Sequence, residues 1–168
     1  MAPHLTLRAA AAADLEAIMA IERTAGFERY VGRSTAAEHR AMMASPDYAY
    51  LVGEADERGI AAFAILRDLN DAHGNLYLKR IAVSRPGEGV GGAFLAQVVA
   101  WGFAHTAAHR FWLDCFVHNA RAQRVYQKLG FTRDGVARQA YRADDGSRID
   151  LAIMAITRPE WSARADGG

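Results

Sequence analysis

The chain lacks the residues that would mark several classes of protein. Among its 168 residues Cys115 is the only cysteine, so no internal disulfide can form, and a reducing compartment, the cytoplasm, is expected. Its 20 basic and 19 acidic residues give a net charge of +1, which offers no basis for bulk binding to nucleic acid or to a membrane. No apolar run predicts a membrane span, and the 6 histidines show no paired spacing typical of metal ligands.

What the chain does have is the composition of one globular domain. Hydrophobic residues make up 51% and charged residues 23% of it. Strand-like and helix-like segments alternate in the order β-α-α-β-β-β-α-β-α-β-β. This order predicts a mixed α/β domain of the α+β type, largely antiparallel, with one right-handed β-α-β unit. We expect the domain to span residues 1–160 and residues 161–168 to form a frayed tail.

Glycine is concentrated at one joint of the predicted fold. The stretch "RPGEGVGG", Arg85 to Gly92, holds four glycines between the strand-like "NLYLKRIAV" and the helix-like "AFLAQVVAWGFA". The start of a helix offers unpaired N–H groups and the positive end of the helix dipole, and glycine lets a ligand approach the backbone closely. The joint therefore predicts a phosphate site at the carboxyl end of the strand.

Three other interpretations of this joint compete with a specialised cofactor loop. The glycines match the dinucleotide pattern G-x-G-x-x-G, but Ser84–Pro86 separate the first glycine from the strand, and a single β-α-β unit is not a doubly wound sheet. The nucleotide P-loop needs Lys and Ser or Thr after its last glycine, where Ala93 and Phe94 stand. A tight turn with close helix–strand packing is the third interpretation.

A second motif, one predicted strand later, favours the cofactor loop. Together with the glycine joint, the segment "NARAQRVYQKLGF" makes the chain closely similar to the GNAT superfamily of N-acetyltransferases. The later signature of that family is met by Asn119, Ala122, Tyr126, Gly130 and Phe131. In the loop, Gly89 and Gly91 fill the glycine positions, whereas Pro86 stands where the family usually has Arg or Gln, and Arg85 lies one residue too early.

The resemblance implies a fold and a co-substrate. The fold would be a mostly antiparallel, seven-stranded sheet that is splayed at its central parallel pair, with about four helices. The co-substrate would be acetyl-coenzyme A, with its diphosphate on the loop amides and its pantetheine arm against the strand before the loop. The cofactor-binding positions that this implies are Ile81, Ala82, Val83, Arg85, Gly87, Glu88, Gly89, Val90, Gly91, Gly92, Ala93, Asn119, Ala122 and Tyr126.

Acetyl transfer from a thioester to an amine requires a base, donors for the oxyanion and a proton donor for the thiolate. The resemblance assigns the proton donor to Tyr126. The strand before the loop carries no acid where many relatives have a glutamate, so the base must come from elsewhere. We expect Glu22 in this role, and the remaining candidates are Glu28, Asp114 and His118.

The acceptor is expected to be a primary amine of a small molecule or a peptide. In this fold the segment after the first helix and the last hairpin flank the thioester, which implies substrate contacts at Phe27, Tyr30, Arg138 and Tyr141. Two segments, "IERTAGFERYVGR" and "YRADDGSRIDLAIM", are loosely similar to subgroups that acetylate protein N-termini or polyamines. The missing strand glutamate favours an alternative, a non-catalytic acyl-coenzyme A sensor. Because dimers are common in the family, a homodimer is the default assembly.

Overall fold

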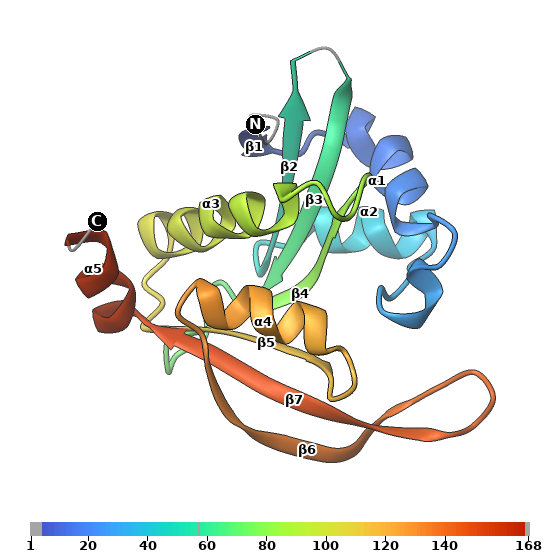
Figure 1. Ribbon diagram of the computed structural model, residues 1–168. Helices are drawn as coiled ribbons and strands as arrows, with labels where there is room; N and C mark the ends of the chain where they lie inside the picture. Colours follow the sequence, from blue (N-terminus) through green and yellow to red (C-terminus); the bar gives the residue numbers. More distant parts are fainter. Residues whose placement is uncertain (1–4, 57, 167–168) are drawn as a thin grey trace.

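A twisted seven-stranded sheet forms the middle of the molecule in the computed structural model, which describes residues 5–56 and 58–166 (Figure 1). Its strands are β1 (Leu5–Ala9), β2 (Tyr48–Ala55), β3 (Gly59–Arg67), β4 (Asn75–Val83), β5 (Arg110–Phe116), β6 (Thr132–Arg142) and β7 (Arg148–Thr157). They lie in the order β1-β2-β3-β4-β5-β7-β6, and every neighbouring pair is antiparallel except β4–β5. The predicted α+β class is confirmed.

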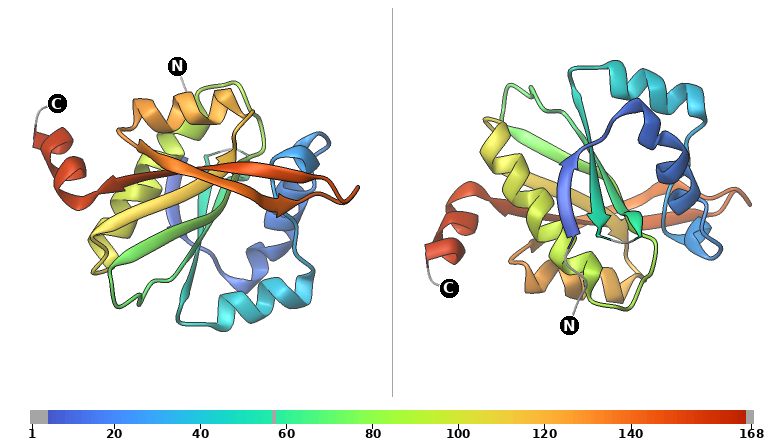
Figure 2. Two further views of the ribbon diagram at one scale, coloured as in Figure 1. Left: turned by 90° about the horizontal axis from the view of Figure 1, so that it is seen from below. Right: turned by 90° about the horizontal axis from the view of Figure 1, so that it is seen from above.

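Helices cover both faces of this sheet (Figure 2). One face carries α1 (Leu15–Glu22) and α2 (Ala36–Ala44), and the other carries α3 (Val90–His105) and α4 (Ala120–Lys128). The larger apolar core lies under α3, and a smaller one lies under α1 and α2. Burying both faces stabilises the sheet, which can then hold functional groups at its centre in fixed positions. No helix in the described ranges has the length and apolar content that crossing a bilayer requires.

The described residues end in a helix where a frayed tail is expected. Helix α5 (Arg158–Asp166) brings the described residues to five α-helices, one more than predicted. Trp161 packs against the larger core, and the Arg158 guanidinium donates to the carbonyls of Phe103, Thr106 and Ala108 at the end of α3. These contacts satisfy helix-end carbonyls and hold the tail. The expected domain boundary at residue 160 falls inside α5, and residues 167–168 lie outside the described residues.

The parallel pair is joined only at its start. β4 and β5 pair over Asn75–Tyr77 and Arg110–Trp112, and no further pairing between them is present in the described residues. Beyond Tyr77, the β4 backbone groups that face β5 therefore have no strand partner. The predicted splay of the central pair is confirmed, and it leaves a gap in the middle of the sheet.

A β-bulge in β4 changes which side chains face that gap. The register between β3 and β4 shifts between Leu78 and Arg80, so that Lys79 is an extra residue without a partner on β3. Side chains alternate along a strand, and one extra residue therefore exchanges the two faces. Leu78 packs in the larger core, whereas Ala82, four residues on, packs in the smaller one. The bulge thus turns Arg80 toward α1 and places Lys79 at the gap.

Candidate active site

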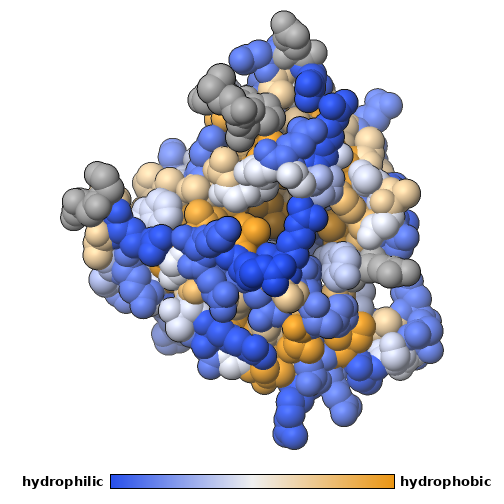
Figure 3. Space-filling view, viewed as in Figure 1, coloured by the Kyte–Doolittle hydropathy of each residue, from blue (hydrophilic) through white to orange (hydrophobic). Residues whose placement is uncertain are grey.

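The glycine loop and the start of α4 enclose a cavity of about 330 Å³. Its lining includes Ile81, Ala82, Val83, Gly87, Gly89, Gly91, Gly92, Asn119, Ala122 and Tyr126, all of them sequence-predicted cofactor positions. Three other predicted positions, Arg85, Glu88 and Val90, line a hollow beside β1 and β2 instead, and Ala93 lines neither space. On the face seen in Figure 3, apolar residues show in a hollow that hydrophilic residues surround.

The backbone of the loop has the shape of an anion cradle. Gly87 and Gly89 have φ angles of 104° and 77°, a left-handed conformation that glycine adopts without strain. Gly89 directly precedes α3, so the unpaired amides of the first helical turn lie at the cavity. A Cβ atom at Gly89 would meet no protein atom within 4 Å, which leaves that space for a ligand. Glu88, Val90 and Ala93 can act here only through their backbone N–H groups.

A cation missed by the sequence analysis lines the same cavity. Arg121, in the first turn of α4, reaches across to the loop, and its Nη2 lies 3.6 Å from the Cβ position of Gly87. It can offer a positive charge where Pro86 has replaced the usual Arg or Gln. The only signal in the sequence is its place inside the "NARA" motif, between Asn119 and Ala122, the two residues that the family pattern names.

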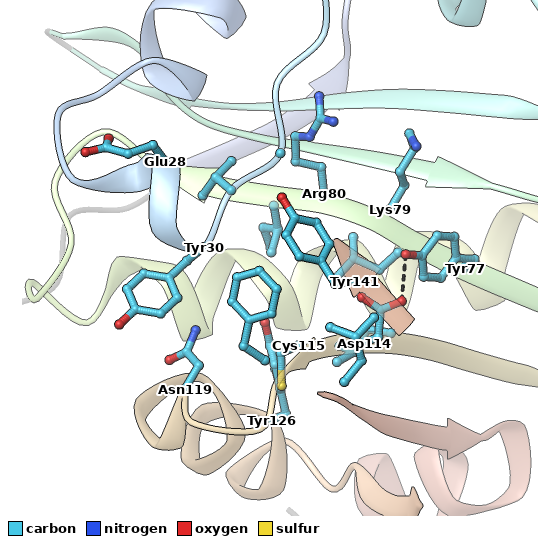
Figure 4. A pocket seen from close by; sticks show the side chains of 17 residues that line it. Glu28, Tyr30, Tyr77, Lys79, Arg80, Asp114, Cys115, Asn119, Tyr126 and Tyr141 are labelled. Carbon is cyan, nitrogen blue, oxygen red and sulfur yellow. Dashed lines mark hydrogen bonds between the residues drawn. The ribbon is translucent and has the colours of Figure 1, made fainter. Parts of the chain in front are cut away.

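A second cavity, of about 280 Å³, lies in the gap between β4 and β5 (Figure 4). Side chains from both strands, from the segment after α1 and from the last hairpin line it, among them Glu28, Tyr30, Tyr77, Lys79, Asp114 and Tyr141. The two cavities share Tyr30, Ile81, Asn119 and Tyr126. A ligand on the glycine loop and a second ligand in the gap can therefore meet at Tyr126.

Tyr126 has the protonation state that a proton donor needs. It is partly buried and stands on α4, close to Cys115 of β5 (Figure 4). Burial raises the pKa of its phenol above the usual value, and the neighbouring Cys115 and Asp114 act in the same direction. The phenol is therefore protonated at neutral pH. Burial also raises the pKa of the Cys115 thiol to about 11, which keeps this cysteine uncharged and a poor nucleophile.

Asn119 has a structural role as well as a place in the cavity wall. Its side-chain oxygen accepts the Ala122 N–H at 3.2 Å, which caps the start of α4. The cap fixes the direction of the helix that carries Tyr126, and Gly130, with a φ of 99°, ends it. The second sequence motif therefore encodes a short helix held at both ends, with a tyrosine aimed at the gap.

Glu22, the base expected from the sequence, lies in neither cavity wall. Its carboxylate is fully buried, 2.5 Å from the Arg80 Nη1 and 3.2 Å from the His39 Nε2, and it accepts the Ser34 N–H at 3.1 Å. These contacts tie α1 to β4 and fix Arg80, which lines the cavity of the gap. Glu22 therefore holds a lining residue in position without lining the cavity itself.

Among the other candidates for the base, Glu28 and Asp114 line the gap cavity, while His118 stacks on Phe116 at 5.4 Å. Asp114 is half-buried, and burial raises the pKa of its carboxyl group above the usual value. Its Oδ2 accepts a hydrogen bond of 2.9 Å from the Tyr77 hydroxyl. Burial and the nearby Arg80 lower the pKa of the Lys79 ammonium group.

The expected acceptor contacts are partly brought together. Tyr30 and Tyr141 line the gap cavity, and the ring of Phe116 links them, with centroid distances of 6.3 and 4.9 Å. Phe27 instead packs against the smaller core, and Arg138 lines neither cavity.

Tyr77, Lys79 and Phe116 were missed by the sequence analysis because they resemble ordinary strand residues. The uneven spacing of apolar residues in β4, at 76, 78, 81 and 83, is the one signal of the bulge that exposes Lys79.

The fold, with a parallel pair that separates beside a glycine loop, defines the class of acetyl-coenzyme A-dependent N-acetyltransferases. Residues 15–131 match the model of the Acetyltransferase (GNAT) family. The chain belongs to this family, and members of the family use acetyl-coenzyme A. The family and the fold implied by the sequence resemblance are thus confirmed.

Individual relatives are more distant. The Uncharacterized N-acetyltransferase YoaA from Bacillus subtilis is 31% identical over 65 residues, which cover 39% of this chain and only 36% of that protein. A crystal structure of the spermidine N-acetyltransferase from Vibrio cholerae in complex with CoA and spermine aligns with a TM-score of 0.83 and 19% identity, covering 95% of this chain and 98% of the other. The same enzyme in complex with manganese ions aligns with a TM-score of 0.80 and 19% identity, covering 96% of each chain. At such identities the likeness shows the fold alone.

Proposed function

We propose that this protein transfers an acetyl group from acetyl-coenzyme A to a primary amine by direct attack of the amine on the thioester. The observation that carries this proposal is that the glycine-loop cavity and the gap cavity share Tyr126. Two substrates bound on opposite sides of the sheet would bring an amine, a thioester and a phenol to one place.

The glycine loop would hold the diphosphate of the co-substrate. Amides at the start of α3 supply hydrogen bonds and the positive end of a helix dipole, and Arg121 adds a charge. The unpaired edge of β4 from Ile81 to Val83 offers backbone groups to the amide-containing pantetheine arm. The residues present therefore fit coenzyme A along the whole length of the cavity.

The reaction would develop negative charge first on the thioester oxygen and then on sulfur. Backbone N–H groups near Ile81, left without a strand partner by the splay, are placed to stabilise the oxyanion. Tyr126, protonated at neutral pH, would give its proton to the departing thiolate. This assigns Tyr126 the role of general acid.

The gap cavity suits an acceptor that arrives as a cation. Asp114 provides a carboxylate, and Tyr30, Tyr77 and Tyr141 provide aromatic faces. The Arg80 guanidinium in the same wall is already paired with Glu22. The Vibrio cholerae neighbour was crystallised with spermine, so polyamines are the first acceptors to test on this chain. Peptides with a free N-terminus are the second, since Tyr30, which lines the cavity, is 52% exposed and can contact a larger acceptor.

Calorimetry and a thiol-release assay test the proposal in two stages. Acetyl-coenzyme A should bind to the wild-type protein, and thiol should appear with at least one amine from a panel of spermine, spermidine, lysine methyl ester and a short peptide. Tyr126→Phe should bind the co-substrate as the wild type does and lose about 10²- to 10⁴-fold in kcat. Unchanged turnover in Tyr126→Phe would remove the phenol from the mechanism.

One observation favours a second function, a non-catalytic acyl-coenzyme A sensor. No acid stands on β4 between Tyr77 and Lys79, where many relatives carry their base. A sensor would bind acetyl-coenzyme A and release no thiol with any amine of the panel. Thiol release with any one amine would exclude the sensor and support the N-acetyltransferase.

A further inference from the structure

We propose that Asp114 on β5 accepts the proton of the acceptor's ammonium group, in the role that an acid on β4 fills in many relatives. This inference rests on the proposed function and names the base that the sequence left open. Three sets of contacts carry it: the face of the sheet on which Asp114 lies, the hydrogen bond that orients it, and the engagement of the other carboxylates.

Asp114 lies on the side of the sheet from which an acceptor would enter. Along β5, Phe111 and Leu113 are buried in the larger core under α3, so Asp114 points to the opposite face. It stands two residues beyond Trp112, the last β5 residue paired with β4, where the gap has opened. Tyr126 reaches the gap from the α4 side. The base and the acid thus flank the gap from opposite faces.

The Asp114 carboxylate is oriented and still has an oxygen to offer. The Tyr77 hydroxyl donates to Oδ2 at 2.9 Å (Figure 4), and no other hydrogen bond to this carboxylate comes from the described residues. Tyr77 is itself held, because its ring stacks on Trp112 at 4.3 Å and lies under the Arg67 guanidinium at 5.2 Å. Oδ1 is therefore available to an ammonium group, and Tyr77 is a positioning residue.

The other carboxylates near the site are engaged elsewhere. Glu22 is buried against Arg80 and His39 and lines no cavity. Glu28 accepts the Gly26 N–H at 2.9 Å and lies 3.6 Å from the Arg33 guanidinium. Figure 4 shows its carboxylate turned away from Asp114 and Tyr126. Asp114 is left as the acid that lies inside the gap.

The environment of Asp114 makes it a better base than an exposed aspartate. Burial raises the pKa of its carboxyl group, while the Tyr77 hydrogen bond and the Lys79 charge oppose that rise. The other titratable and charged groups that share this cavity are Tyr77, Lys79 and Arg80 of β4, Cys115 of β5, Tyr126 of α4, Tyr141 of β6, and Glu28 and Tyr30 from the segment after α1. A raised pKa brings the carboxylate closer to the proton affinity of an amine, which favours proton transfer.

The proposed steps balance as follows. The ammonium group gives one proton to Asp114, and the freed lone pair forms the C–N bond while the carbonyl electrons move to oxygen. Collapse of the oxyanion breaks the C–S bond, whose electron pair stays on sulfur, and sulfur takes the Tyr126 proton. The second proton of the nitrogen restores the phenol through solvent. Asp114 releases its proton to solvent, so each turnover yields an amide, a free thiol and one proton.

The test is the pH dependence of kcat/KM for Asp114→Asn, measured by thiol release with the most active amine of the panel. Wild-type activity should fall at acid pH as Asp114 becomes protonated. Asp114→Asn should lose about 100-fold or more at pH 7 and recover as the pH approaches the pKa of the free amine, near ~10. Acetyl-coenzyme A binding should be unchanged. Asp134→Asn, on the exposed ion pair with Arg110, is the matched control and should behave as the wild type.

Two further measurements separate a base from a merely structural residue. Removing the Lys79 charge in Lys79→Met should raise the pKa of Asp114 and move the acid limb to higher pH. In protein labelled with carbon-13 at the aspartate carboxyl groups, the Asp114 signal, assigned by its loss in Asp114→Asn, should titrate above the ordinary ~3.9 without any acceptor present. Any of three results would overturn the proposal. The loss of kcat/KM in Asp114→Asn could be the same at every pH, or the acid limb of the kcat/KM profile could move in Glu28→Gln and not in Lys79→Met. The third is an Asp114 carbon-13 signal that titrates at the ordinary value of an aspartate. A wild-type protein that binds no acetyl-coenzyme A would refute the proposed function separately.

Discussion

Replacing Gly89 by alanine tests the glycine loop most directly. Gly89 has a φ of 77°, and a side chain in that left-handed conformation costs about 1–2 kcal/mol. For a domain of this size the melting temperature should fall by about 2–8 °C. The new Cβ would contact no protein atom within 4 Å, so the strain is the whole cost to the free protein.

The same substitution should also weaken acetyl-coenzyme A binding, because the new Cβ would occupy space in the cofactor cavity. Displacing the diphosphate from one loop amide removes a hydrogen bond to a charged group, worth about 1.5–3 kcal/mol. The dissociation constant measured by calorimetry should therefore rise about 10- to 150-fold.

Two matched variants isolate the effect on binding. Gly146, at the tip of the last hairpin, has a φ of 85° and equally open surroundings, so Gly146→Ala should lose similar stability and no affinity. Gly91 lies inside α3, 3.9 Å from Val83 at its Cβ position, and the family pattern allows alanine there. Gly91→Ala should keep both stability and affinity. If Gly89→Ala melts like Gly146→Ala and binds acetyl-coenzyme A like the wild type, the loop amides do not hold the diphosphate.

Three further substitutions test the cofactor cation, the core and the buried ion pair. Arg121→Ala should weaken acetyl-coenzyme A binding about threefold to fivefold, because a solvent-exposed charge contributes ~1 kcal/mol. Arg124→Ala, on the same helix, should leave the affinity unchanged. An equal loss of affinity in the two variants would contradict the role of Arg121. Gly102→Ala would put a Cβ 2.8 Å from a core leucine, and this overpacking should cost about 1–3 kcal/mol in denaturant unfolding. Glu22→Gln leaves Arg80 buried without its charged partner and should cost about 3–5 kcal/mol of stability. A Glu22→Gln protein of normal stability whose kcat collapses would instead restore Glu22 as the base.

Most of the fold could be predicted from local sequence patterns. Alternating apolar residues marked the strands, the Asp-Gly step marked the last hairpin, and glycine marked both ends of the loop. The tail was the exception. Residues 161–166 are polar enough to be read as frayed, but Trp161 and Arg158 are held by the core and by the end of α3, which only the assembled fold brings near.

The site was harder to predict from the sequence because it depends on contacts between segments that lie far apart along the chain. Motifs predicted Tyr126 and the loop glycines as site residues, and the structure places these residues in the cavity walls. Glu22 was expected to be the base because the sequence does not show its partner: Arg80 lies 58 residues away and points to α1 only after the bulge. Asp114 was one of several candidate bases, and the sequence could not set it apart because the Tyr77 hydroxyl that orients it comes from 37 residues away.

The meeting of the two cavities at Tyr126 also predicts a kinetic order for the proposed reaction. Because the two cavities have only Tyr30, Ile81, Asn119 and Tyr126 in common, both substrates can be bound at once, and neither product has to depart before the second substrate arrives. No cysteine in the described residues is reactive enough to carry the acetyl group between them, given the raised pKa of Cys115. Initial-rate plots against both substrates should therefore intersect, as they do for a ternary complex, and should not run parallel.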